Sequence, residues 1–191
     1  MATEIESALA HYRLVPEEST FTVQAFAEGL FSAFGHDPVI AVRSFNGSAE
    51  FTPETFERAS LHLTIEASSL QVANEVKEKD RLEIENTMHR EVLDVQNYPQ
   101  IKFDSTNVTL SRLGQGRYRA RLIGDLTLRG VTQKNVWITA EVTVADEMLR
   151  AKGDYQLRQT DFKIKPVSVA GGTLKIKNEL KCTFDICARP S

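Results

Sequence analysis

Stretches in which apolar and polar residues alternate recur along most of this chain. Residues 119–128 are the clearest case, and their apolar track consists of Ala120, Leu122, Gly124, Leu126 and Leu128. Successive side chains of a β-strand point to opposite faces of a sheet, so the pattern is typical of sheets with one apolar face and one face in water. Residues 173–184 repeat it. The pattern predicts an all-β fold of antiparallel strands.

The same pattern predicts at least eight strands and one helical insertion. The expected strands cover residues 11–15, 20–27, 39–51, 59–67, 100–105, 108–113, 117–128, 136–144, 147–157, 162–169 and 173–186. Asn46–Gly47, inside one of these ranges, favours either a hairpin turn or a bulge. Residues 74–94 change to a helical period. Closing the strands into a barrel would remove exposed sheet edges, and we expect residues 1–10 to be a lead-in and 11–191 to form one barrel domain.

The bulk composition argues against two classes of protein. The formal net charge of −3 offers no basic surface for nucleic acid. No stretch approaches the roughly 18 to 20 apolar residues of a membrane-spanning helix. The N-terminus carries Glu4 and Glu6 and lacks the basic start and apolar run of a secretory signal peptide. We therefore expect a cytoplasmic protein with no integral membrane segment and no nucleic-acid partner.

No motif for a metal, a cofactor or a catalytic nucleophile stands out. The four histidines, at positions 11, 36, 62 and 89, lack the spacing of metal ligands. Cys182 and Cys187 lie five residues apart on one expected strand and would face opposite sides of it, which predicts two free thiols. Phosphate-loop and dinucleotide-binding glycine motifs are missing too. Neither a metal nor a cofactor is expected.

Several segments, in their order and spacing, resemble the YceI-like family of lipocalin-like β-barrels. The resemblance runs from about His11 to the C-terminus. It is carried by Gly35-His36-Asp37 with Phe45-Asn46-Gly47, by Ser69-Leu70, and by residues 79–93, 98–105, 124–132 and 158–162. It implies an extended eight-stranded antiparallel up-and-down barrel with a helical insertion. It also implies a long isoprenoid or related amphiphilic chain held in the barrel, and many family members are periplasmic.

The resulting hypothesis is a barrel that binds a long-chain apolar or amphiphilic ligand, isoprenoid or fatty-acid-like, without catalysis. Burial of apolar surface yields about 25 cal/mol per Å², so several hundred Å² of hydrocarbon would suffice for binding. The inward residues expected to contact this ligand are Phe45, Leu63, Ile101, Phe103, Leu126, Leu128, Ile138, Leu157 and Ile176, with either Ala25 or Phe26.

Four other positions are candidate ligand contacts for different reasons. His36 could hydrogen-bond a head group or act as a base, although His36-Asp37 also suits a turn. Arg129 follows two inward leucines and could meet an anionic head group, or simply occupy a hairpin turn. Gly124 on the inward track would leave room for a chain. Asn178 lies on the inward track between Ile176 and Leu180, where a buried amide needs a partner.

Two other functions remain open at this point. One is an enzyme acting on a hydrophobic substrate, with His36 at its centre. The other is a structural or interaction module whose barrel is filled by side chains, and association into a homodimer is left open as well. Arg158, Gln159 and Asp161 interrupt the alternation, which favours a bulge with a local salt bridge.

Overall fold

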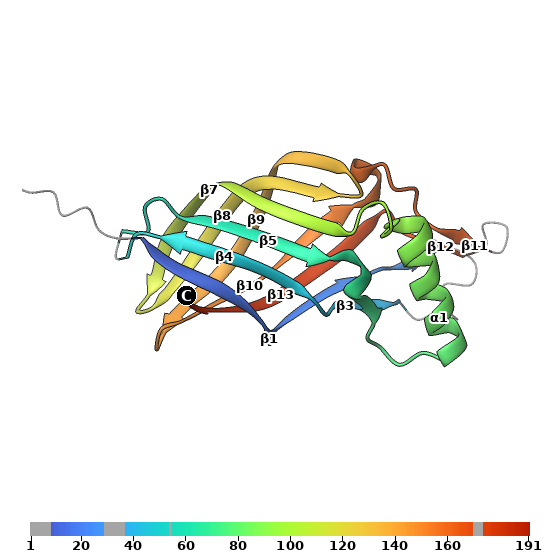
Figure 1. Ribbon diagram of the computed structural model, residues 1–191, viewed down its shortest axis with the longest axis horizontal. Helices are drawn as coiled ribbons and strands as arrows, with labels where there is room; N and C mark the ends of the chain where they lie inside the picture. Colours follow the sequence, from blue (N-terminus) through green and yellow to red (C-terminus); the bar gives the residue numbers. More distant parts are fainter. Residues whose placement is uncertain (1–8, 29–36, 54, 170–173) are drawn as a thin grey trace, which may run out of the picture.

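The computed structural model describes residues 9–28, 37–53, 55–169 and 174–191, and in them eight long strands close into an antiparallel barrel (Figure 1). Each strand pairs with the next along the chain, and the last pairs with the first. The predicted closed up-and-down barrel is confirmed. Its strands are β1 (Ala10–Gln24), β4 (Phe45–Phe51), β5 (Ser60–Glu66), β7 (Gln100–Gly114), β8 (Arg117–Leu128), β9 (Val131–Ala145), β10 (Met148–Arg158) and β13 (Glu179–Pro190).

Shorter strands add to one end of this barrel. β3 (Val39–Val42) pairs with the far end of β1, and β6 (Leu70–Val72) pairs with β3. A separate three-stranded sheet of β2 (Ala27–Glu28), β12 (Leu174–Ile176) and β11 (Ser168–Val169) lies at the same end. These short strands extend the barrel wall at the end where α1 lies (Figure 1).

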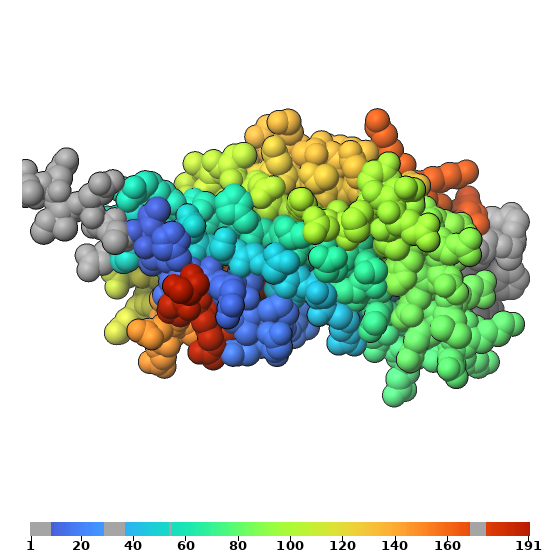
Figure 2. All heavy atoms as spheres, viewed as in Figure 1, coloured from blue at the N-terminus to red at the C-terminus, as the bar shows by residue number. Residues whose placement is uncertain are grey.

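The helical insertion covers that end. It consists of α1 (Glu78–Thr87) followed by a π-helical turn (Met88–Val92), within the range that the sequence predicts. Glu85 Oε1 accepts the Val72 N–H at 2.9 Å, and His89 Nε2 lies 2.8 Å from Leu70 O. A carbonyl oxygen only accepts, so this His89 nitrogen carries the proton. These bonds hold the insertion against β6, and Figure 2 shows it on the outer surface at this end.

Several strand predictions need correction. Residues 11–15 and 20–27 were expected as two strands, but β1 is one strand with a bulge, because Val15 pairs with Cys187 and Thr20 pairs with Asp185. Pro16 lies in that bulge, where no ladder N–H is required. Asn46–Gly47 makes neither a turn nor a bulge but lies inside β4, in regular pairing with β5. The expected strand 39–51 is divided into β3 and β4, and the expected strands 100–105 and 108–113 form one strand, β7.

Two further corrections concern residues 159–178. The expected strand 162–169 is reduced to β11, and a 3-10 turn, η4 (Gln159–Phe162), follows β10 directly. The expected strand 173–186 is divided into β12 and β13 at Lys177–Asn178. A further 3-10 turn, η2 (Ala67–Ser69), connects β5 and β6. Among the described residues, no helix has both the length and the apolar character needed to cross a membrane.

Candidate functional site

An apolar chamber of about 260 Å³ occupies the barrel interior. Alternate residues of each strand point into it, because the strands are pleated. Because this chamber is present, side chains do not fill the interior completely. Seven of the residues predicted to face inward line it. They are Leu63, Ile101, Phe103, Leu126, Leu128, Ile138 and Leu157.

Four aromatic rings pack together at the end of the chamber that lies away from α1, and two of them, Phe51 and Phe56, line it. Phe51 stacks on Tyr12 with ring centroids 5.3 Å apart, and it packs at a tilt against Phe56 with ring centroids 5.4 Å apart. Phe56 in turn lies 4.5 Å from Tyr118, near the start of β8. We call Tyr12, Phe51, Phe56 and Tyr118 the aromatic plug.

A second cavity of about 380 Å³, the vestibule, lies under the helical insertion and the small sheet. Ile84 and Met88 line it from the helix side, and Ile176 lines it from β12. Polar residues in its lining include Asp80, Glu83, Thr87 and Lys175. The vestibule meets the chamber at a junction whose residues line both cavities: Val23, Leu70, Val92, Leu93, Gln159 and Leu180.

Three predicted contacts lie elsewhere than expected. Ile176 lines the vestibule rather than the chamber. Phe45 is buried at 5% exposure and packs edge-on against Phe21, behind the chamber lining. Of the alternatives Ala25 and Phe26, Ala25 lines the vestibule. Whether these residues touch a ligand stays a prediction.

The space beside Gly124 is taken by an aromatic ring. A Cβ at Gly124 would lie 2.7 Å from Phe103 Cζ and 2.6 Å from Asp104 O. Gly153 on β10 has the same relation to Phe184, whose Cζ would be 2.7 Å away. Gly124 faces inward as predicted, but the room it leaves accommodates Phe103 and not a free path for a chain.

Two polar candidates, Arg129 and Asn178, have roles in the local structure: one lies in a turn and the other bonds to a neighbouring segment. Arg129 and Gly130 form the two-residue turn between β8 and β9, with φ values of 49° and 71°. Asn178 was expected on a strand but lies in the bend before β13. Its Oδ1 accepts the Thr160 N–H at 3.0 Å, and its Nδ2 donates to Thr160 Oγ1 at 2.9 Å. Its amide therefore fixes η4 against this bend.

His36 lies outside the described residues. Its neighbour Asp37 is described, and its Oδ1 accepts the Ala27 N–H at 2.8 Å, at the start of β2. Within the described part of the chain, no group of three or more His, Cys, Asp or Glu side chains is placed to hold a metal ion.

Sequence reasoning missed Gln159 and Tyr155 as cavity residues. The interrupted alternation predicts a bulge at Gln159, but this residue is 3% exposed and lines both cavities. Tyr155 continues the inward track of β10 two residues before Leu157, and that alternation was the available signal. Burial is the main cause that raises the Tyr155 pKa, so its hydroxyl stays protonated at neutral pH.

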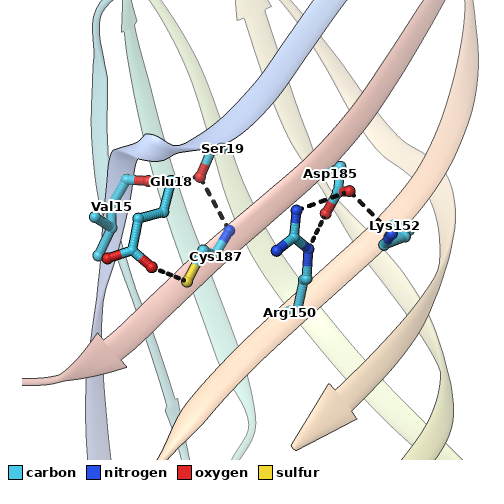
Figure 3. A network of polar contacts seen from close by, with 7 residues as sticks. All are labelled: Val15, Glu18, Ser19, Arg150, Lys152, Asp185 and Cys187. Carbon is cyan, nitrogen blue, oxygen red and sulfur yellow. Dashed lines mark hydrogen bonds and ion pairs between the residues drawn. The ribbon is translucent and has the colours of Figure 1, made fainter.

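The two cysteines are free and face opposite sides of β13, as predicted. Cys182 lines the chamber, and burial raises its pKa to about 12. Cys187 lies under the bulge of β1, where its N–H donates to Ser19 Oγ at 3.0 Å and its thiol lies 3.5 Å from Glu18 Oε2 (Figure 3). Burial is the first cause that raises the Cys187 pKa. Neither thiol has the lowered pKa of a nucleophile.

Ion pairs fix the outer face of β13. Arg150 Nε and Nη2 lie 2.5 and 3.0 Å from the two carboxylate oxygens of Asp185, and Lys152 Nζ lies 3.0 Å from Oδ2 (Figure 3). The hydrogen bonds from Arg150 are the first cause that lowers the Asp185 pKa. Arg189 makes a similar two-point contact with Glu18 and lowers the pKa of that carboxyl. These pairs join β10, β13 and the bulge of β1.

The fold and its interior define a class of protein: a closed antiparallel barrel whose apolar chamber adjoins a vestibule at one end. The family model described as the YceI-like domain matches residues 12–188. The chain belongs to the YceI-like family, which confirms the resemblance seen in its sequence.

Solved structures share this fold at low sequence identity. BcnA of Burkholderia cenocepacia aligns with a TM-score of 0.68 and 15% identity over 91% of this chain and 98% of its own. A polyisoprenoid binding domain from Saccharophagus degradans aligns with a TM-score of 0.68 and 11% identity. The alignment covers 96% of this chain and 100% of that domain. The YCEI protein of Campylobacter jejuni aligns with a TM-score of 0.60 and 15% identity. The alignment covers 80% of this chain and 84% of that protein. No curated protein matches the sequence.

Proposed function

We propose that this protein binds a long-chain apolar or amphiphilic molecule, with the apolar chain in the chamber and the polar end toward the vestibule. The observation that carries the proposal is the apolar chamber, which Phe51 and Phe56 of the aromatic plug line at one end and which adjoins the vestibule at the other. Each cavity is near the lower end of the roughly 300–1,000 Å³ usual for small-molecule sites, and the two adjoin.

The chemistry of the chamber lining supports a ligand whose apolar chain is held by burial. Leucine, isoleucine, valine and phenylalanine side chains from all sides of the barrel reach the chamber. Burial of hydrocarbon yields about 25 cal/mol per Å², or about 0.8 kcal/mol per methylene, and needs no reactive group. The polyisoprenoid binding domain from Saccharophagus degradans, named for such a ligand, shares the fold and supports an isoprenoid as one candidate.

The test has two parts. Protein purified under native conditions is extracted with organic solvent, and the extract is read by mass spectrometry for long-chain lipids and isoprenoids. Delipidated protein is then titrated with 1-dodecanol and with farnesol. We expect a co-purified chain or saturable one-to-one binding. An empty extract together with no binding of either probe would show the proposal to be wrong.

A further inference from the structure

Gln159 is the buried polar side chain at the junction of the two cavities. It is 3% exposed, and the other junction residues are Val23, Leu70, Val92, Leu93 and Leu180, all apolar. A chain that occupies both cavities must pass this amide. An amide in such a place affects what can be bound, because a buried polar group without a partner is costly.

The hydrogen bonds around Gln159 fix which way its amide faces. Nε2 lies 2.9 Å from Lys177 O. Because a backbone carbonyl can only accept, this atom must be the NH₂ group, and Oε1 is directed elsewhere. The backbone N–H of Gln159 donates to Asn178 O at 3.0 Å, so the residue is held at two points by the bend before β13.

Oε1 is left as a free acceptor. Among the described residues, no donor bonds to Oε1. An atom without a partner can still be exposed or sealed from solvent, and the only described side-chain nitrogen or oxygen that is both sealed and without a partner is Thr52 Oγ1. Oε1 therefore keeps some accessible surface. Since Gln159 is almost fully buried and lines both cavities, we assign that surface to the cavity side.

We propose that Gln159 Oε1 accepts a hydrogen bond from a hydroxyl or amide N–H of the bound amphiphile, and that the protein thereby prefers neutral ligands that carry a donor. The inference rests on the proposed function and specifies its ligand class. A carboxylate head group is disfavoured, because it would bring a second acceptor to Oε1. The acidic residues Asp80 and Glu83 in the vestibule lining disfavour it further, although Lys175 also lies there.

The experiment compares two probes of equal size, 1-dodecanol and 1-methoxyundecane, of which only the alcohol carries a donor. Each is titrated into delipidated full-length protein by calorimetry. We expect the wild type to bind the alcohol about fivefold more tightly, the ratio that one net hydrogen bond supplies. Gln159→Met keeps the side-chain length and removes the acceptor, so it should bind both probes equally.

Gln156→Met is the matched control. Gln156 lies on β10 three residues before Gln159 and is exposed on the outer face, so this variant should keep the wild-type preference. Gln159→Glu is a second variant at the same position. At a pH where the introduced acid is protonated, its O–H can donate to Lys177 O and its other oxygen can accept from the ligand. The alcohol preference should then persist.

The outcomes separate the two proposals. Equal binding of both probes by the wild type would overturn the role of Gln159 while leaving the proposed function intact. Equal loss of affinity for both probes in Gln159→Met would show a structural amide and also overturn it. If Gln159→Met does not fold, the wild-type ratio and Gln159→Glu decide. No binding of either probe to the wild type would contradict the proposed function itself.

Discussion

Phe103 on β7 packs so closely against Gly124 on β8 that a Cβ at Gly124 would lie 2.7 Å from its ring. The glycine on one strand makes the space for the ring on the next. Phe103 is 3% exposed and lines the chamber, so this pair sets the shape of the cavity wall at that point.

Gly124→Ala should lower the free energy of unfolding by about 1–3 kcal/mol, the usual cost of overpacking. The Asp104 carbonyl, 2.6 Å from the new Cβ, belongs to the backbone and cannot move aside easily. Urea denaturation followed by fluorescence measures the change. Gly114→Ala is the control, because no atom lies within 4 Å of a Cβ there. A change below about 0.5 kcal/mol in Gly124→Ala would contradict the packing described here.

Affinity for straight-chain alcohols should rise with length until the chain reaches the aromatic plug. Each added methylene that is buried contributes about 0.8 kcal/mol, nearly fourfold in Kd. Calorimetry with alcohols of increasing length measures the series. A plateau is expected where the chamber ends at Phe51 and Phe56, which both line it. Affinity that does not depend on chain length would argue against a chain in the chamber.

Ala151→Phe should shorten the space available to such a chain. Ala151 lines the chamber in the half of β10 that lies toward the β9–β10 turn. The added ring should weaken binding of long alcohols by about fourfold for each methylene excluded, and leave short ones unaffected. Ala145→Phe, at an exposed position at the end of β9, is the control in the same titrations. Equal affinity of Ala151→Phe and wild type for every length would rule out this path.

The pair between Asp185 and Arg150 predicts a dependence of stability on pH. The folded pKa of Asp185 lies below its ordinary value of 3.8, chiefly through the Arg150 hydrogen bonds. Its stabilisation is therefore complete above the unfolded pKa and is lost as the pH falls through the folded pKa. Asp185→Asn should lower the urea midpoint at pH 7, and the difference from wild type should shrink below pH 3.8.

Asp154→Asn is the control for this measurement. Asp154 is an exposed acid on β10, the strand that also carries Arg150 and Lys152. Its replacement should leave the urea midpoint close to that of the wild type. A gap between Asp185→Asn and wild type that stays constant from pH 7 to pH 2.5 would indicate lost packing instead of a lost ion pair.

Cys182 should resist alkylation in the folded protein. Its pKa is raised to about 12 by burial, so almost no thiolate exists at pH 8. Iodoacetamide, read by mass spectrometry, should leave Cys182 unmodified in native protein and modify both cysteines in guanidinium chloride. Rapid labelling of Cys182 in the native protein would show that the chamber admits polar reagents.

Strand periodicity predicted the inward residues where the chain stays regular. Leu63, Phe103, Leu126 and Ile138 all line the chamber because the two-residue period fixes their direction. Periodicity could not show that Phe103 occupies the space beside Gly124, because the two residues meet only through strand pairing.

The predictions failed where long-range hydrogen bonds interrupt a strand. Asn178 was placed on an inward track, but its amide pairs with Thr160, eighteen residues earlier, and the strand breaks there. The same turn buries Gln159, a residue that local sequence assigns to a bulge. The sequence predicts separate strands at 11–15 and 20–27, whereas pairing with β13 on both sides of the bulge makes β1 one strand.

The position of the aromatic plug affects the route by which a bound molecule could enter and leave the barrel. Phe51 and Phe56 line the chamber at the end away from α1, and Tyr118 packs against Phe56. A guest that enters tail first from the vestibule would bring its tail to these rings. Its head group would then be the last part to enter and, on leaving by the same route, the first to emerge. Any partner that takes up the guest would therefore have to bind beside α1.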